Sequence, residues 1–456
     1  AIWSLDSSGN PVGLVGPGGE PVISLATSAF TPYRLATFGD SRVNAGGTHL
    51  TTVTAASISG EKVPGALCCV RGDMQVVFNG GISGDSAANW NSAGRVSTNQ
   101  TVRDLMAATP DLVLIQYGIN DIIAGAPAST VAGYLQALID KLLGVGIPVI
   151  FESVNPCATS SVSYINGYGA SGGFGASAAA KLTEMQSLNA IMESWMTQFP
   201  KNITLYVDTS AATTGVDGYA KTDGTYYDGT HLSRIGCMAV AKAIDVAIRD
   251  YFPIKRGQRI KGIYPNGINR SFLSPSSGRA ANFNAITVDN GTATATYQIV
   301  EDADGDLCQE YNVTVTGLGG STCRMFFGMI PDWAGASPFF SLAAGDVLQA
   351  AFDYTIDDGA GGQPIVHEVY GRGRIFYDDA SNEYTQHGAI AVTTSTDFPV
   401  ISDSESGKIL TPRLAVKAAL ASANMLGTTT LQCHVISNQL GTFRLRIKNP
   451  QWLKVA

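Results

Sequence analysis

Between Tyr33 and Tyr251, short apolar segments alternate with longer amphipathic ones, and this alternation constrains the fold more than any other feature of the sequence. The apolar segments have the length of strands and show little of the polar alternation of a half-exposed sheet. This is typical of strands that are buried on both faces. Such strands are predicted at Leu35–Phe38, Gln75–Phe78, Leu112–Tyr117, Pro148–Phe151 and Ile203–Val207.

Several of the intervening segments repeat their apolar residues at helical spacing. They are predicted as helices over Val131–Leu143, Lys181–Gln198 and Ser233–Tyr251. A regular exchange of strand and helix implies parallel strands with helices on both faces of the sheet, so the predicted fold class is α/β. In such folds the groups that carry chemistry are expected at the carboxyl ends of the strands.

After Phe252 the pattern changes: Pro253–Ser271 is basic and contains Gly, as linkers do, and short runs with partial alternation follow. They predict strands at Thr294–Val300, Glu310–Thr316, Val347–Tyr354, Ile365–Tyr370, Arg374–Tyr377, Ala389–Thr393, Thr428–Ser437 and Gly441–Ile447, with one short helix at Arg413–Ala423. Short strands separated by turn clusters such as DDGAGGQ (357–363) favour an antiparallel, jelly-roll-like β-sandwich.

These features divide the chain into four parts. Residues 1–30 include the stretch GNPVGLVGPGGEPV and are interpreted as a Gly/Pro-rich, extended connector. Residues 31–254 form the α/β domain, residues 255–272 the linker, and residues 273–456 the β-sandwich.

Composition excludes several classes of partner. Charged residues make up 14% of the chain, where about 25% is usual, and the net charge is −8. No stripe of Lys and Arg is present, which disfavours nucleic acid and an anionic membrane surface as partners. No apolar run reaches about 18 residues and no signal peptide is visible, so no transmembrane segment is expected. The chain begins with Ala1 rather than Met, which leaves open what lies upstream.

The seven cysteines are odd in number and show neither a C-x-x-C pair nor a Cys/His zinc spacing. They are expected to be buried free thiols, without a disulfide framework or a metal site. Cys308 and Cys323 fall in segments that could be neighbouring strands, and the sequence leaves their pairing open.

Four short stretches with polar groups lie at the ends of predicted strands or just before a helix. They are Phe38–Arg42 (FGDSR), Asn79–Ser86 (NGGISGDS), Gln116–Asp121 (QYGIND) and Asp228–His231 (DGTH). A Ser hydroxyl, Gly N–H groups, an Asn amide and an Asp three residues before a His can act as nucleophile, oxyanion donors and an oriented base. Taken singly, each stretch is also an ordinary helix cap or strand-to-helix turn.

In this order and over one α/β domain, the four stretches resemble the blocks of the SGNH (GDSL-type) hydrolase family. The family's blocks are Gly-Asp-Ser, a Gly block, Gly-x-Asn-Asp and Asp-x-x-His. They correspond here to residues 39–41, 81–86, 118–121 and 228–231. The resemblance covers only the α/β half. It departs at Arg42, where the family name has Leu at a variable position.

The resemblance implies a three-layer, flavodoxin-like domain and an ester hydrolase that requires no metal or cofactor. It implies Ser41 as the nucleophile, His231 as the general base and Asp228 as the carboxylate that orients the base. It also implies an oxyanion hole made by the backbone N–H groups of Ser41 and Gly84 and by the side-chain amide of Asn120.

Two of these assignments have a second candidate nearby. Asp223 also precedes His231, but Asp228 fits the Asp-x-x-His spacing. Gly81 belongs to the same block as Gly84, but the glycine directly before Asp-Ser matches the family block better.

Other polar and aromatic features are interpreted as structural. Asp40 and Asp121 are expected to be hydrogen-bonding groups beside the site. The acidic run Asp302–Asp306 lacks the Gly and Glu positions of an EF-hand loop and is expected to be a solvated hairpin turn. Trp90 and Trp333 are expected to pack in a core or an interface rather than to stack on sugar rings.

Three further features favour one substrate class. No long amphipathic lid is evident, a β-sandwich follows the esterase half, and the Gly/Pro-rich N-terminus and weak charge resemble phage tail-fibre or tailspike proteins. We therefore predict a polysaccharide O-acetylesterase acting on a bacterial surface glycan, in an extracellular or virion-associated location. The sandwich would bind carbohydrate or mediate oligomerisation, and the tail-protein resemblance implies a homotrimer.

Two other readings stay open at this point. One is a general carboxylester hydrolase, lipase or thioesterase, which a preference for longer acyl chains would identify. The other is a structural tail-fibre module with a vestigial site. The sequence names neither the glycan, the acetylated position nor the host.

Overall fold

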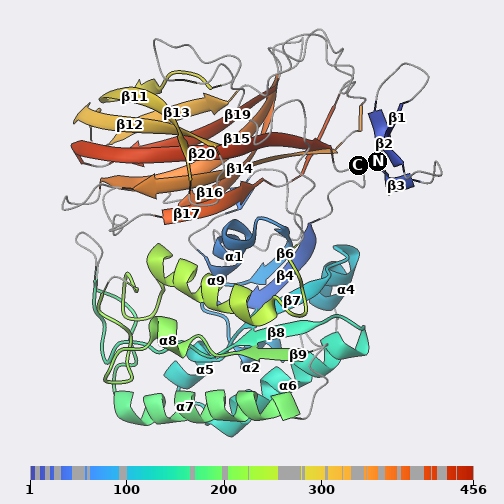
Figure 1. The fold of residues 1–456 in the computed structure, drawn as a ribbon. Helices are drawn as coiled ribbons and strands as arrows, with labels where there is room; N and C mark the ends of the chain where they lie inside the picture. The colour runs from blue at the N-terminus through green and yellow to red at the C-terminus, as the bar shows by residue number, and fades with distance from the viewer. Residues whose placement is uncertain are drawn as a thin grey trace.

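Figure 1 shows the computed structural model as a ribbon. It describes residues 2–5, 11–15, 21–24, 32–43, 57–58, 62–91, 100–164, 170–197, 204–223, 225–254, 279, 283–302, 307–320, 322–329, 344–345, 347–357, 365–376, 382–390, 405–411, 413–417, 429–437 and 439–454.

The α/β half is built on a parallel sheet of five strands in the order β6-β4-β7-β8-β9. In chain order these are β4 (Tyr33–Gly39), β6 (Met74–Gly81), β7 (Leu112–Gln116), β8 (Val149–Glu152) and β9 (Thr204–Val207). The order corresponds to the 2-1-3-4-5 arrangement of flavodoxin-like sheets. The predicted parallel α/β sheet is therefore confirmed.

The strands of this sheet are buried on both faces because successive side chains enter two different cores. In β7, Leu112 and Leu114 pack in the first core, and Val113 and Ile115 pack in the second. The first core is closed by α1 (Val63–Arg71) and α9 (Arg234–Ile248), and the second by α2 (Ala87–Trp90), α4 (Gln100–Ala107), α5 (Ile119–Ile123), α6 (Ala128–Gly144) and α7 (Ala178–Ser194). Two short turns, η1 (Trp195–Thr197) and α8 (Ser210–Thr213), flank β9 in the chain. The domain consequently has three layers, helices on either side of one sheet.

The C-terminal half is a β-sandwich, because two sheets share one apolar core. One sheet has the order β10-β13-β19-β15-β16-β5 and the other β11-β12-β20-β14-β17, with β18 paired to β14. The strands are β10 (Thr287–Asn290), β11 (Thr292–Glu301), β12 (Leu307–Gly317), β13 (Cys323–Met329), β14 (Val347–Asp357), β15 (Val366–Phe376), β16 (Asn382–Ile390), β17 (Glu405–Leu410), β18 (Leu414–Ala415), β19 (Thr429–Ser437) and β20 (Gly441–Lys454). Phe327 and Val435 of the first sheet meet Tyr311 and Phe352 of the second in this core.

Helix α1 lies between the two halves and belongs to both. Figure 1 shows it beneath the sandwich, where it contacts β16 and β17, and beside the parallel sheet. Cys69 of this helix packs in the core of the sandwich, whereas Leu67 and Cys68 pack in the first core of the α/β half. The side chain of Lys408, on β17, lies against Gly72 at the end of the helix.

A second connection comes from β5 (Ser57–Ile58), which follows the β4 segment in the chain but pairs in parallel with β16 of the sandwich. The α/β half therefore contributes one strand to a sheet of the other half. All other strand pairs of the two sandwich sheets are antiparallel.

The N-terminal residues differ from the predicted extended connector. Within the described residues they form an antiparallel sheet of three strands, β1 (Ile2–Leu5), β2 (Pro11–Val15) and β3 (Pro21–Ser24), paired in chain order. A composition rich in Gly and Pro is as typical of the turns between short strands as it is of a connector.

Two predictions for the sandwich are corrected. Ile365–Tyr370 and Arg374–Tyr377 were predicted as separate strands, but β15 is continuous through Gly371 and Gly373. The helix predicted over Arg413–Ala423 is wrong where the structure describes it, because Leu414–Ala415 is strand β18, paired with β14. Pairing with a neighbouring strand overrides a local helical pattern.

All seven cysteines are buried thiols, as predicted, and no disulfide joins Cys308 to Cys323. Among the helices that the structure describes, none is long and apolar enough to cross a membrane.

A buried hydrogen bond, 3.1 Å from Nε2 of Gln349 in β14 to Oε1 of Gln75 in β6, joins the two halves. A buried amide that loses its partner costs about 1–3 kcal/mol, so Gln75→Leu and Gln349→Leu should each lower the free energy of unfolding by about that amount. The double variant should lose less than the sum, because the hydrogen bond between the two amides is broken in each single variant and can be lost only once. Urea unfolding of the four proteins checks this, and strictly additive losses would contradict a direct coupling.

Candidate active site

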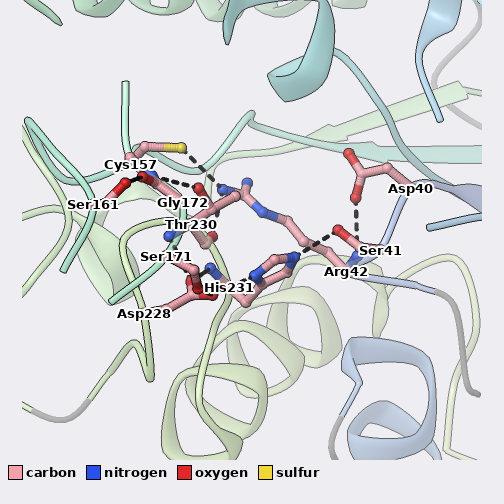
Figure 2. Close-up of polar contacts among 11 residues, drawn as sticks. Asp40, Ser41, Arg42, Cys157, Ser161, Ser171, Gly172, Asp228, Thr230 and His231 are labelled. Atoms are coloured by element: carbon pink, nitrogen blue, oxygen red, sulfur yellow. Dashed lines mark hydrogen bonds and ion pairs between the residues drawn. The ribbon is translucent and has the colours of Figure 1, made fainter. Parts of the chain in front are cut away.

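At the carboxyl edge of the parallel sheet, Ser41, His231 and Asp228 form a continuous chain of hydrogen bonds (Figure 2). Oγ of Ser41 lies 2.8 Å from Nε2 of His231, and Nδ1 of His231 lies 2.8 Å from Oδ2 of Asp228. Asp228 is buried, whereas the imidazole is 25% exposed and can be reached from solvent. The structure thus brings together the three residues that the sequence motifs single out as a triad.

The turn that carries Ser41 directly follows β4 and requires glycine before it. A Cβ on Gly39 would lie 2.4 Å from a methyl carbon of Val43 and 2.7 Å from a backbone carbonyl oxygen of β7. The carboxylate of Asp40 closes the turn, because its Oδ1 accepts a hydrogen bond from the backbone N–H of Arg42 at 2.9 Å. Burial raises the pKa of Asp40, and the charge of Arg42 opposes that rise. Asp40 is thus a structural group of the turn.

Asp228 is held by donors on both of its oxygens. Oδ1 accepts from the backbone N–H groups of Thr230 at 2.7 Å and His231 at 2.6 Å, and Oδ2 accepts from Oγ of Ser171 at 2.8 Å in addition to the imidazole. Burial alone would raise the pKa of Asp228, but the hydrogen bond and charge of His231 and the backbone donors outweigh it and lower the pKa. The carboxylate is therefore stabilised as an anion that orients the imidazole.

Ser171 is a site residue that the sequence analysis missed. Its loop pairs with the loop of the Asp-x-x-His motif: the N–H of Gly229 donates to the carbonyl of Ser171 at 2.9 Å, and the N–H of Gly173 donates to Oγ1 of Thr230 at 2.9 Å. A Cβ on Gly229 would lie 2.7 Å from the backbone nitrogen of Gly173. The close approach of the two loops therefore requires the glycine in this motif.

Tyr227 is a second residue that the sequence analysis did not single out. Its ring stacks on the imidazole of His231, with the centroids 5.4 Å apart and the planes 7° from parallel. The backbone N–H of Tyr227 also donates to the carbonyl of His231 at 3.1 Å. The stacking restricts the rotation of the imidazole, and the backbone bond holds the loop that carries it.

The predicted oxyanion donors follow β6 and β7, the two strands that flank β4: Gly84 lies on the loop after β6, and Asn120 lies at the start of α5, the helix after β7. Nδ2 of Asn120 donates to the carbonyl oxygen of Asp85 at 2.6 Å, and the hydroxyl of Tyr117 donates to the carboxylate of Asp85 at 2.9 Å. These bonds tie the loop after β6 to the segment that enters α5, so that Gly84 and the amide of Asn120 are held on neighbouring segments.

The alternatives left open by the sequence have other partners. The N–H of Gly81 donates to Oδ1 of Asn79 at 2.9 Å, whereas the N–H of Gly84 has no acceptor among the residues described. Asp223 accepts from the N–H of Thr225 in its own turn, and within the described residues no hydrogen bond joins Asp223 to the imidazole.

The remaining polar and aromatic candidates are structural where they can be placed. Asp121 accepts hydrogen bonds from the first two N–H groups of α2, at 2.9 and 3.0 Å. Trp90 is buried and stacks edge-on against Phe38. Trp333 and residues 303–306 lie outside the described residues. In the part of the chain that is described, no three His, Cys, Asp or Glu side chains are arranged to hold a metal ion.

A cluster of buried polar side chains from β7 and β8 lies beside the Ser41 turn, which it meets where the N–H of Asp40 donates to the carbonyl of Gln116. Nε2 of Gln116 donates to Oε1 of Glu152, and Nδ2 of Asn155 donates to the same oxygen at 3.1 Å. Burial raises the pKa of Glu152 to about 8, although the bond from Gln116 and the charge of Arg42 oppose the rise. Glu152 is therefore mostly neutral at pH 7.

Because of Glu152, stability should fall as the pH rises. Its carboxyl group titrates near 4.5 in the unfolded chain and near 8 in the folded one, so in this window only the folded state keeps the proton. The free energy of unfolding should decline across the window, by at most about 1.4 kcal/mol per pH unit, and Glu152→Gln should remove this part of the decline. Urea unfolding of both proteins from pH 5 to pH 9 measures it; an identical pH dependence would refute the assignment.

The comparison with known proteins agrees with the motifs. The model of the GDSL-like lipase/acylhydrolase family matches residues 37–238. No curated protein matches the chain.

Several solved structures are similar to parts of the chain. A GDSL-like lipase from Bacteroides thetaiotaomicron is 18% identical, with 48% of this chain and 88% of that chain covered and a TM-score of 0.33. An acetylxylan esterase from Geobacillus stearothermophilus, in a catalytic mutant, is 20% identical, with 48% and 94% covered and a TM-score of 0.34. A structure of carbohydrate-binding modules from the β-sandwich superfamily is 10% identical, with 39% and 59% covered and a TM-score of 0.24.

The family match spans the strands of the parallel sheet and the four motifs at its carboxyl edge, from the end of β4 to the start of α9. The α/β half of this chain is accordingly a domain of the GDSL-like lipase/acylhydrolase family, the SGNH hydrolases.

Proposed function

We propose that the protein is a serine esterase that removes O-acetyl groups from a polysaccharide through an acyl-enzyme. The observation that carries the proposal is the hydrogen-bonded chain from Ser41 through His231 to Asp228 at the carboxyl edge of the sheet. A Ser hydroxyl is a weak nucleophile unless a base beside it takes its proton, and the 2.8 Å contact supports that transfer.

In the acylation step, Oγ of Ser41 attacks the ester carbonyl carbon while its proton passes to Nε2 of His231. The imidazolium that results is stabilised by the carboxylate of Asp228, which stays ionised. The negative charge that develops on the carbonyl oxygen is received by the N–H groups of Ser41 and Gly84 and by the amide of Asn120. The imidazolium then gives its proton to the leaving sugar oxygen, and the C–O bond to the alcohol breaks.

Deacylation repeats these steps with water as the nucleophile. His231 takes a proton from water as the water oxygen attacks the acetyl carbonyl, and the proton then passes to Oγ of Ser41 as acetic acid leaves and ionises to acetate. The residues named here account for each proton transfer and for the charge of both tetrahedral intermediates.

The choice of an acetylated polysaccharide is supported by features outside the triad. The β-sandwich is fixed to the esterase domain through α1, and the chain combines low charge with an excess of Gly, 51 of 456 residues. The loop of Gly84 and Ser83 is exposed at the site, which suits a chain-like substrate that reaches the nucleophile from the surface.

Ser41→Ala should abolish acetate release from acetylated bacterial polysaccharides and from 4-nitrophenyl acetate. We expect a loss of at least about 10³-fold in kcat, because the nucleophile is removed while the fold is kept. Ser187→Ala, an exposed serine of α7, serves as the matched control and should keep full activity. Equal rates for Ser41→Ala and the wild type would reject the serine mechanism, whereas no acetate release from either protein would favour a structural module with a vestigial site.

Activity should fall as the acyl chain lengthens. With 4-nitrophenyl acetate, butyrate and octanoate, kcat/KM is expected to be highest for acetate, because the proposed substrate carries the smallest acyl group. Rates that rise with chain length would support a general carboxylester hydrolase, lipase or thioesterase in place of the deacetylase.

The proposed substrate also implies a location and an assembly. An acetylated surface glycan lies outside the cell, so the proposal extends to an extracellular or virion-associated protein, and a homotrimer is proposed with it. Light scattering after size exclusion should give about three times the chain mass of 47.7 kDa, and a mass equal to one chain would refute the trimer.

A further inference from the structure

Arg42 directly follows the nucleophile, yet its side chain turns away from solvent and is only 5% exposed. Figure 2 shows the guanidinium extending from the Ser41 turn toward the loops of Cys157 and Thr230. Nothing in the reaction described above uses this residue. Burial of an arginine side chain at this place costs free energy, because a buried cation loses its hydration.

The guanidinium bonds to backbone carbonyls on two different loops. Nη1 donates to the carbonyl of Asn155 at 2.9 Å, and Nη2 donates to the carbonyl of Thr230 at 2.8 Å. A weaker contact joins Nη2 to Sγ of Cys157 at 3.7 Å. The Thr230 carbonyl belongs to the peptide bond that leads into His231, so Arg42 is hydrogen-bonded to the backbone directly before the base.

The charge of Arg42 has no direct ion pair among the residues described. Its Nε is buried without a hydrogen-bond partner. Asp40 and Glu152 are buried nearby, and Arg42 opposes the rise that burial causes in the pKa of each carboxyl. The cation is thus held by carbonyl dipoles and by the field of neighbouring acids rather than by a salt bridge, an arrangement that favours a role in geometry over one in stability.

We propose that Arg42 is a positioning residue for the ester hydrolysis proposed above, on which this inference rests: it fixes the distance between Ser41 and His231. These two residues are 190 positions apart in the sequence, and the Arg42–Thr230 bond joins the same two loops as their own hydrogen bond. The Ser41–His231 bond is lost once Oγ is acylated. The Arg42–Thr230 bond persists, so the imidazole stays at the distance that the deacylating water requires.

The test compares Arg42→Lys and Arg42→Met with Arg71→Lys, all measured in the full chain. Arg71 is the matched control: it is also a fully buried arginine, but it is bonded to Asp73 and Asp245 and takes no part in the site. For Arg42→Met we expect kcat on 4-nitrophenyl acetate to fall by about 10- to 100-fold, with KM changed less than about threefold, since small misplacements of a base cost this much. Arg42→Lys keeps a donor and should recover part of the loss.

Two further readouts separate positioning from stability. The rate at which a fluorophosphonate labels Ser41 should fall with kcat in both Arg42 variants. Arg71→Lys should lower the melting temperature while leaving kcat per folded molecule unchanged.

The inference is overturned if Arg42→Met keeps the wild-type kcat at a temperature where it is folded. It is also overturned if kcat in the three variants simply follows their melting temperatures. If Arg42→Met does not fold, a wild-type kcat and labelling rate in Arg42→Lys decides against it in the same way. Full activity in Ser41→Ala would instead overturn the proposed function, an outcome distinct from an Arg42 variant that fails to lose activity.

Discussion

The structure depends on the need to cover both faces of a parallel sheet. The residues of β7 alternate between two apolar cores, and each core must be closed by helices. On one face α1 and α9 do this, and on the other face α6 and α7 are the longest elements. Each connection between parallel strands runs back over a face of the sheet as a helix. The segments that leave the carboxyl ends of the strands carry the residues of the site.

The loops hold more buried polar groups than an apolar core would tolerate, and they do so because nearly every group has a partner. Asp228 has donors on both oxygens, and Asp85 accepts from Asn120 and Tyr117. Glu152 accepts hydrogen bonds from Gln116 and Asn155, yet burial still drives its carboxyl toward the neutral form. The region of the site therefore combines an anion kept charged by its neighbours, Asp228, with an acid kept neutral by its surroundings, Glu152.

The parts of this arrangement that could be predicted from sequence are those whose signal is local. The apolar run of β7 is continuous, and the Asp-x-x-His spacing alone places a carboxylate beside the imidazole. Ser171 gave no such signal, because its partner lies 57 residues further along the chain, in another loop. The carbonyl that Arg42 binds is 188 residues away, so only the folded chain reveals the contact.

The sandwich was harder to predict for a similar reason. The prediction divided strand β15 into two and ended the first of them at Tyr370, directly before Gly371. In the structure Gly371 is a packing residue: a Cβ there would lie 2.4 Å from a methyl carbon of Ile409 and 2.7 Å from the ring of Phe352. The short strand β10 depends on its partner β13 across the sheet, and its four residues, TVDN, do not distinguish it from a loop.

Helix α1 packs in the cores of both halves, so the two halves cannot be separated at the linker that the sequence predicts. In the sequence, the linker at residues 255–272 separates two apparently independent modules. In the structure, α1 and β5, which precede the linker, contact strands of the sandwich, which follows it. Grafting the esterase onto a different sandwich would need a new surface matched to Cys69 and Gly72. The joint between the two halves is therefore part of both cores and would have to be kept in any such exchange.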